Sequence, residues 1–228
     1  MKEDRVALAV MARAPSDRGG KTRLLAALRI DDGTDLRRAI LLDTMDIVGQ
    51  AAAAQPVVLY TPATADAELA KLSGGRWSLI PQRGEDLGER LEHAFTDLFT
   101  RGYAGALIIG SDLPTLPVEY VTLAAAQLMA LADPVVLGPA RDGGYYLIGL
   151  RKAHPELFRG VAWSTASVLA ETMSIARNAG LEFSLVPEWY DIDSVEDLRR
   201  ATAATHLGAN RASRTEGIIA RLDGASRG

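Results

Sequence analysis

The sequence predicts an α/β fold with three layers, in which a mostly parallel sheet lies between helices. Short apolar runs typical of buried strands alternate with helical patterns of ten or more residues along most of the chain. Such alternation favours right-handed crossover connections and a parallel sheet. The two strand-like runs within 134–150 are too close for a helical crossover, so we expect at least one antiparallel strand.

The expected strands are short aliphatic runs bounded by glycine, proline or polar residues. The turn Asp142-Gly143-Gly144, which lies between the expected strands 134–137 and 145–150, favours a hairpin. The strands are expected at residues 6–11, 57–60, 77–80, 106–109, 134–137, 145–150 and 181–186.

The expected helices carry apolar residues at helical spacing. In the segment 36–48, Leu36, Ile40 and Met45 fall on one face. A helix is also expected to begin at the end of the loop that follows the first strand. The remaining helices are expected at 63–72, 87–99, 118–131, 164–178 and 194–205.

Length and composition are those of an ordinary globular protein. The 228 residues, 48% hydrophobic and 24% charged, fit one domain. We expect this domain to span residues 1–206, and residues 207–228, rich in Gly, Ala, Ser and Arg, to form a flexible tail.

The sequence also excludes several classes of protein. No apolar run approaches the ~18 residues of a membrane span, and no cleavable signal peptide is recognisable. The chain has no cysteine, which excludes disulfides and thiol nucleophiles and agrees with a cytoplasmic location. A net charge of −4 argues against a nucleic-acid partner. The oligomeric state stays open.

The loop after the first strand is a candidate anion site. Residues 12–24 contain two glycines and four cations, among them Arg13, Lys21 and Arg23, and the loop leads into a helix N-terminus. Backbone amides and fixed positive charge together suit phosphates. The Gly20-Lys21-Thr22 sequence is not a P-loop, because Pro15 stands where that motif requires glycine. The alternative is a solvated loop with ordinary surface cations.

Asp112 is the most informative single residue. It follows the strand 106–109 in the sequence Gly110-Ser111-Asp112-Leu113-Pro114. Ligands of open α/β sheets bind at the carboxyl ends of strands. A carboxylate there can hold a divalent cation against a phosphate. The structural alternative is that Asp112 caps the helix expected near Pro117.

Residues 82–90 follow the end of the expected strand 77–80. Asp86 and Glu89 are placed to form a capping box. Gly88 falls in the first helical turn, where glycine is unfavourable unless a backbone or a ligand comes close. We therefore predict that Gly84 and Gly88 approach a flat nucleobase.

Two later segments carry further polar groups. Arg141, Asp142, Gly143 and Tyr145 lie in or beside the hairpin turn and could bind a polar acceptor through charged groups and tyrosine hydroxyls.

Near the C-terminal end, Asp191 and Asp193 are two residues apart in an extended segment, so both carboxylates can reach one cation. Ser194 is placed to cap the next helix, with Asp197 in the reciprocal position.

Other common sites are absent from the sequence. No Gly-x-Ser-x-Gly, His-Glu-x-x-His or Gly-x-Gly-x-x-Gly motif occurs. His93, His154 and His206 show no metal-ligand spacing, so we interpret all three as structural or surface residues.

Taken in order, these motifs resemble the DUF2064-type uncharacterised-domain family of the nucleotide-diphospho-sugar transferase (GT-A) superfamily, which is usually labelled glycosyltransferase. More distantly, the chain is similar to 2-phospho-lactate guanylyltransferases and molybdopterin cofactor nucleotidyltransferases. The resemblance implies a Rossmann-like sheet, a nucleotide over the strand ends, and Mg²⁺ or Mn²⁺ held by Asp112. It rests on residues 21–24, 84–88, 110–114, 138–149, 163–165 and 191–198.

The resemblance leaves two reactions open. In one, a nucleotide-sugar donates its glycosyl group to a small acceptor. In the other, a nucleoside triphosphate donates its nucleotidyl group to a phosphorylated acceptor, and Lys21 neutralises the α-phosphate. Many glycosyltransferases carry Asp-x-Asp at the central strand, whereas this chain has one aspartate there and a second acidic site at 191–193, as nucleotidyltransferases do. A non-catalytic nucleotide-binding module and a purely structural domain are the remaining alternatives.

Overall fold

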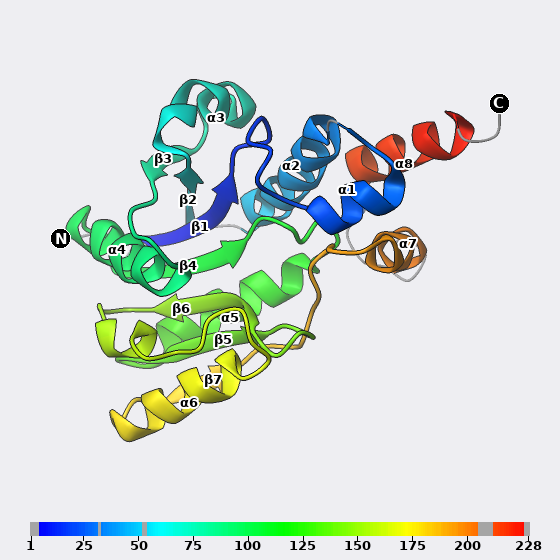
Figure 1. Ribbon diagram of the computed structural model, residues 1–228. Coiled ribbons are helices and arrows are strands. Elements are labelled where there is room, and N and C mark those ends of the chain that lie inside the picture. Colours follow the sequence, from blue (N-terminus) through cyan, green and yellow to red (C-terminus); the bar gives the residue numbers. More distant parts are fainter. Residues whose placement is uncertain (1–4, 32, 52–53, 205–211, 226–228) are drawn as a thin grey trace.

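The middle layer of the protein is a sheet of seven strands in the order β3-β2-β1-β4-β6-β5-β7 (Figure 1). The computed structural model describes residues 5–31, 33–51, 54–204 and 212–225. Strand β6 runs antiparallel to both its neighbours, β4 and β5, and the other strand pairs are parallel. The strands are β1 (Val6–Arg13), β2 (Ala54–Thr61), β3 (Ser78–Pro81), β4 (Gly105–Gly110), β5 (Val135–Pro139), β6 (Tyr145–Leu150) and β7 (Phe183–Leu185).

Helices cover both faces of this sheet, which confirms the three-layer prediction. Helices α2, α3 and α5 pack on one face, and α4 and α6 pack on the other. Helices α1 and α7, with part of α2, bury a third apolar cluster beyond the strand ends. The helices are α1 (Thr22–Leu28), α2 (Thr34–Gln50), α3 (Asp66–Ser73), α4 (Leu87–Thr100), α5 (Val118–Ala130), α6 (Val168–Asn178), α7 (Val195–Ala204) and α8 (Ser213–Ala225), with short 3₁₀ turns η1 (Ala63–Ala65) and η2 (Pro155–Phe158).

The sequence of β1 shows why this strand lies in the middle of the sheet. Its residues alternate between the two cores: Val6, Leu8 and Val10 join one apolar cluster, and Ala7 and Ala9 join the other. A strand that is apolar on both faces must be covered on both faces. This burial fixes the carboxyl end of β1 beside that of its parallel neighbour β4.

Two expectations from the sequence need correction. The helix expected at 164–178 begins only at Val168, because the residues before it form a turn in which Ser164 has a φ of 64°. The tail expected to be flexible from residue 207 contains helix α8. Residues 207–211 and 226–228 of that tail lie outside the described residues.

Helix α8 packs against α2 (Figure 1), and Asp43 of α2 binds the first turn of α8. The Asp43 Oδ2 atom accepts hydrogen bonds from the backbone amide and the hydroxyl of Thr215, at 2.9 and 2.8 Å. Arg214 donates to the other carboxylate oxygen at 3.0 Å. The amides at a helix N-terminus need acceptors, and a carboxylate suits them. In the part of the chain that the structure describes, no helix is long and apolar enough to cross a membrane.

Candidate active site

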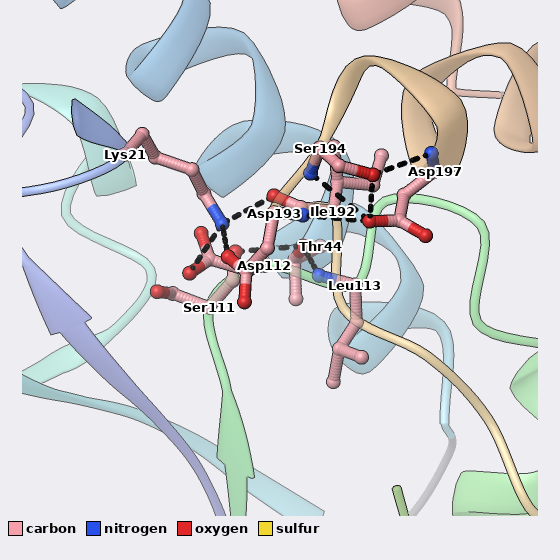
Figure 2. Close-up of polar contacts among 9 residues, drawn as sticks. All are labelled: Lys21, Thr44, Ser111, Asp112, Leu113, Ile192, Asp193, Ser194 and Asp197. Carbon is pink, nitrogen blue, oxygen red and sulfur yellow. Dashed lines mark hydrogen bonds and ion pairs between the residues drawn. The ribbon is translucent and has the colours of Figure 1, made fainter. Parts of the chain in front are cut away.

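Lys21, Asp112 and Asp193 meet at the carboxyl edge of the sheet (Figure 2). Lys21 lies at the start of α1, after the loop that follows β1, and Asp112 lies two residues beyond β4. The two loops adjoin because β1 and β4 are parallel neighbours. Asp193 comes from the segment that leads into α7, far along the chain. The fold therefore brings three of the predicted residues together.

The Lys21 ammonium group is enclosed by oxygen atoms. Its Nζ lies 2.9 Å from Asp112 Oδ2, 2.8 Å from Asp193 Oδ1 and 2.5 Å from the carbonyl oxygen of Ile192. Only 5% of the side chain is exposed. Burial alone would lower the pKa of Lys21, but the two carboxylates outweigh it and hold this pKa above its ordinary value. Lys21 is therefore a fixed positive charge at the site.

The Asp112 carboxylate does not cap the following helix. The N-cap of α5 is Pro117, and no side chain accepts a hydrogen bond there. The structural alternative raised by the sequence is therefore wrong. The Asp112 carboxylate is instead 40% exposed and paired with Lys21. Its backbone carbonyl accepts a hydrogen bond from the amide of Ile192 at 3.0 Å, which fastens this turn to the segment before α7.

Thr44 is a site-supporting residue that the sequence analysis missed. It is fully buried on α2, and its hydroxyl accepts a hydrogen bond from the Leu113 amide at 3.1 Å. The same hydroxyl lies 3.0 Å from the carbonyl oxygen of Ser111, to which it can donate. Thr44 thus contacts the backbone of both residues that flank Asp112, Ser111 and Leu113 (Figure 2). The available signal was a polar residue one helical turn after Ile40 on the apolar face of a helix.

Asp191 is the most perturbed carboxylate of the site. Its Oδ1 atom is buried and has no hydrogen-bond partner among the described residues. Burial, and next the nearby charge of Asp112, raise the pKa of Asp191 to about 7. A group with such a pKa beside a cavity is a candidate for function.

The oxygen donors around Asp112 suit a hard divalent cation. Mg²⁺ bound together with phosphates uses one or two protein carboxylates and keeps several waters. Asp112 and Asp191 can supply two carboxylates. A cation would also give the unpartnered Asp191 oxygen a partner. Asp193, 73% exposed, is a third candidate. Across the described residues, no three His, Cys, Asp or Glu side chains form a ready-made metal site.

A cavity of about 470 Å³ lies beside these charges. Arg23, Asp142, Tyr145, Asp191 and Asp193, all predicted site residues, line it. The other lining residues come from the start of α4 and from the turn before α6: Leu87, Trp163, Ser164, Thr165 and Ala166, with Ala140, Gly144 and Val168.

Size alone does not mark the site. A larger cavity of about 550 Å³ lies between α2 and α8, and none of the predicted site residues lines it.

Arg23 is the cation best placed to meet an anion in the smaller cavity. It lines that cavity, and no carboxylate of the described residues pairs with it. Arg13 is paired with a carboxylate instead, because its guanidinium lies 2.7 Å from Asp17. Arg141 also points elsewhere, because it stacks over the Tyr190 ring at 4.9 Å and lies 3.4 Å from Glu188. The structure therefore separates the predicted arginines into one at the cavity and two held by neighbours.

The tyrosine hydroxyls are not in the cavity, contrary to the expectation for residues 141–146. The Tyr145 hydroxyl is buried beside Thr172, and burial raises the pKa of this phenol. The Tyr146 hydroxyl donates to the carbonyl oxygen of Pro187 at 2.9 Å. What Tyr145 offers a ligand is its ring, which meets the Trp163 ring edge to face at 6.4 Å.

The hairpin turn is supported from within. Asp142 accepts a hydrogen bond from the Gly144 amide at 2.9 Å. Gly143 has a φ of 91°, and a Cβ there would lie 2.2 Å from the Ala166 carbonyl oxygen. Gly143 thus serves the packing of the turn against the segment before α6, and Asp142 lines the cavity.

Gly84 and Gly88 are explained by close packing in the protein itself. A Cβ on Gly88 would lie 2.5 Å from Trp163 Nε1 and 2.6 Å from the Phe158 carbonyl oxygen. Gly84 has a φ of 125°, and a Cβ there would lie 2.7 Å from the Cβ of Glu89. The close approach expected at these glycines is therefore made by neighbouring protein groups. Their contact with a nucleobase stays a prediction.

The expected helix caps are present. Asp86 accepts from the Glu89 amide at 2.9 Å at the start of α4. Ser194 accepts from the Asp197 amide at 3.1 Å, and Asp197 accepts from the Ser194 amide at 3.0 Å (Figure 2). The Ser194–Asp197 cap fixes the residues next to Asp193, so a structural pair supports the site.

The two histidines that the structure describes have structural contacts. His93 lies 3.0 Å from the carbonyl oxygen of Arg83, and His154 bonds to Asp133 and Glu156. His206 lies outside the described residues.

A protein-family model matches residues 44–165 of the chain. The family is described as uncharacterised proteins conserved in bacteria (DUF2064). The chain belongs to this family. The matched region contains Thr44, Asp112, Asp142 and Tyr145, and the resemblance recognised from the motifs is confirmed.

Solved structures share the fold over nearly the whole chain. A protein from Desulfovibrio desulfuricans G20, assigned provisionally as a nucleotide-diphospho-sugar transferase, is 30% identical, with a TM-score of 0.82 and 96% of each chain covered.

Two more distant structures show the same fold. A nucleotidyl transferase from Methanothermobacter thermautotroptrophicus is 14% identical, with a TM-score of 0.58 over 86% of this chain and 95% of that one. A CMP:2-keto-3-deoxy-manno-octonic acid synthetase, solved with CTP, is 12% identical, with a TM-score of 0.55 over 90% and 99%. No curated protein sequence matches the chain significantly.

Proposed function

We propose that the protein is a divalent-cation-dependent transferase that binds a nucleotide or a nucleotide-diphospho-sugar at the carboxyl ends of β1 and β4. The observation that carries this proposal is the cluster of Lys21, Asp112 and Asp193, with the unpartnered Asp191, beside a cavity at that edge. The comparisons support a transferase, because a family relative and the more distant structures of this fold are described as nucleotide-dependent transferases.

Each group has a role that follows from its chemistry. Asp112 and Asp191, with Asp193 as a third candidate, would hold Mg²⁺ or Mn²⁺, which when bound neutralises the charge that develops on the phosphates. Arg23, which lines the cavity, binds phosphate oxygens. Ser111, beside Asp112, and the segment with Gly84 and Gly88 remain candidates for contact with the nucleoside.

The acceptor is expected in the cavity. Asp142 accepts hydrogen bonds from hydroxyl or amine groups, because a carboxylate is an acceptor only. The rings of Tyr145 and Trp163 form an apolar wall against which a flat face of the acceptor can pack. The acceptor is therefore a small molecule with polar edges. The location that we propose for the reaction is the cytoplasm.

Transfer of a glycosyl group is our first assignment, supported by the relative that is 30% identical. Nucleotidyl transfer is the second. It is supported by the arrangement of one aspartate after β4 and a second acidic site before α7, and it releases pyrophosphate from a nucleoside triphosphate.

Thermal unfolding with ligands tests the proposal and separates the two reactions. Wild type, Asp112→Asn and the control Asp66→Asn, on α3, are melted with nucleoside triphosphates, nucleoside diphosphates and nucleotide-sugars, each with and without Mg²⁺. A ligand at a hundred times its Kd adds about 2.7 kcal/mol. We expect a Mg²⁺-dependent rise in Tm that Asp112→Asn loses and Asp66→Asn keeps.

The identity of the effective ligand assigns the reaction. A rise with one nucleoside diphosphate and its sugar conjugate indicates glycosyl transfer, and a rise with triphosphates alone indicates nucleotidyl transfer. Nucleotide binding without any effect of Mg²⁺, and without turnover, would indicate a non-catalytic nucleotide-binding module. No rise with any ligand would contradict the proposal.

A further inference from the structure

The contacts of Lys21 conflict with its expected role as a phosphate ligand. An ammonium group has three N–H donors. Here the three nearest acceptors are Asp112 Oδ2, Asp193 Oδ1 and the Ile192 carbonyl oxygen, at 2.9, 2.8 and 2.5 Å. In this arrangement Lys21 has no donor left for a phosphate.

The same contacts conflict with the expected role of the carboxylates. Asp112 and Asp193 both face the ammonium group of Lys21, which lies between them (Figure 2). A divalent cation on these oxygens would stand next to a buried positive charge, and like charges at such distances repel strongly. The cation and the ammonium group therefore compete for the same oxygens.

The two partners differ in their freedom to move. The Lys21 side chain is 5% exposed, whereas those of Asp112 and Asp193 are 40% and 73% exposed. The backbone of Lys21 is held by the start of α1, where its carbonyl accepts from the Leu25 amide at 2.9 Å. The exposed carboxylates are thus the groups with room to turn away, and their departure leaves the N–H donors of the buried ammonium group free.

We propose that Lys21 is the resident counter-ion of Asp112 and Asp193, and that it exchanges these carboxylates for the phosphates of an incoming nucleotide when a divalent cation binds. The inference rests on the proposed function for the identity of the two ligands. Lys21 keeps the carboxylates compensated while the site is empty, and its released ammonium group then has donors for the phosphates. The cation and the nucleotide consequently strengthen each other's binding, and this coupling is reciprocal.

The exchange predicts an unusual effect of removing the lysine. In Lys21→Met the apolar stem stays but the competing charge is gone, so Asp112 and Asp193 are left uncompensated. We expect this variant to bind Mn²⁺ alone, without nucleotide, at least tenfold more tightly than wild type. Lys71→Met is the matched control, because Lys71 is an exposed lysine of α3 without an ion pair to any described residue. It should bind Mn²⁺ as wild type does.

The Mn²⁺ titration is followed by electron paramagnetic resonance of the free ion, on wild type and both variants. Equal or weaker Mn²⁺ binding by Lys21→Met would overturn the exchange. If Mg²⁺-dependent nucleotide binding by wild type persists in that case, the proposed function stands and only this inference fails. If wild type responds to no nucleotide, the proposed function fails first.

A second measurement uses wild type and does not depend on the folding of a variant. Lysine acetylation by a water-soluble ester is followed by mass spectrometry at Lys21, Lys71 and Lys152, with and without saturating Mn²⁺. Lys21 should react slowly without the ion, and at least fivefold faster with it, while Lys71 is unchanged. A rate at Lys21 that Mn²⁺ does not alter would overturn the inference.

Discussion

Two aspartates with buried carboxylate oxygens, Asp43 and Asp191, have opposite surroundings. Asp43 on α2 is 3% exposed, and both of its oxygens accept hydrogen bonds from the start of α8. Asp191, beside the cavity, has a buried oxygen with no partner among the described residues. Buried carboxylates are stable only when hydrogen-bonded or paired. The satisfied carboxylate therefore belongs to the fold, and the unsatisfied one indicates a site for a ligand.

The largest effect is expected at Asp43. Asp43→Ala leaves the Thr215 amide and hydroxyl without their acceptor, and it should lower the free energy of unfolding by about 3 kcal/mol. Urea denaturation measures the change. Asp35→Ala, at an exposed aspartate in the first turn of the same helix, is the control; it loses only the exposed pair with Arg38, so we expect a change of at most about 1 kcal/mol.

The structural role assigned to Asp43 would be wrong if Asp43→Ala were as stable as Asp35→Ala. The contrast with Asp191 would also be wrong if Asp43→Ala still folded but lost the Mg²⁺-dependent response to nucleotide, because Asp43 would then belong to the site.

A smaller and opposite effect is expected at Asp191. Its pKa in the folded protein is raised from the ordinary 3.8 to about 7, by burial and by Asp112. The folded state thus favours the protonated form, and this aspartate reduces stability progressively as pH rises from the ordinary range of a carboxyl group through about 7.

Asp191→Asn removes this loss of stability. At pH 8.5 the variant should be more stable than wild type by about 1–3 kcal/mol, and at low pH the two should be nearly equal. Urea denaturation across this pH range gives the answer. A variant that is less stable than wild type at every pH would show that the Asp191 carboxylate is a structural group like that of Asp43.

These two aspartates also show what sequence can predict and what it cannot. The strands and the caps at Asp86 and Ser194 depend on residues within a few positions of each other, and these were predicted. The contact of Asp43 with Thr215 joins residues 172 positions apart, and nothing local in the tail indicates it. The flexible tail was predicted for this reason.

The site divides in the same way. The strand-end position of Asp112 and the pair Asp191 and Asp193 follow from periodicity and spacing. The direction of a side chain depends on packing that no local pattern records. Thus the Tyr145 hydroxyl is buried rather than in the cavity, Arg141 lies over Tyr190, and Lys21 is enclosed by carboxylates.

The smallest effect is expected at a carboxylate on the surface, Asp133, which is paired with His154 at 3.1 Å. Burial would lower the pKa of His154, but Asp133 and Glu156 outweigh it and raise this pKa. The contribution of this pairing is present below the ordinary histidine pKa and is lost as pH rises through the raised value.

His154→Gln should therefore destabilise the protein by less than about 1 kcal/mol at pH 5.5 and not at pH 9. Denaturant midpoints at the two pH values measure the difference. A loss of stability that is equal at both values would mean that His154 acts by packing alone, and not through its charge.

The position of a bound cation tests the central claim most directly. Crystals of the wild-type protein, grown with Mn²⁺ and the nucleotide that raises Tm most, are measured at a wavelength where manganese scatters anomalously. The account predicts an anomalous peak within coordination distance of Asp112 and of Asp191 or Asp193, with the Lys21 ammonium group turned to the phosphates. A visible nucleotide without such a peak, or a peak at other carboxylates, would contradict it.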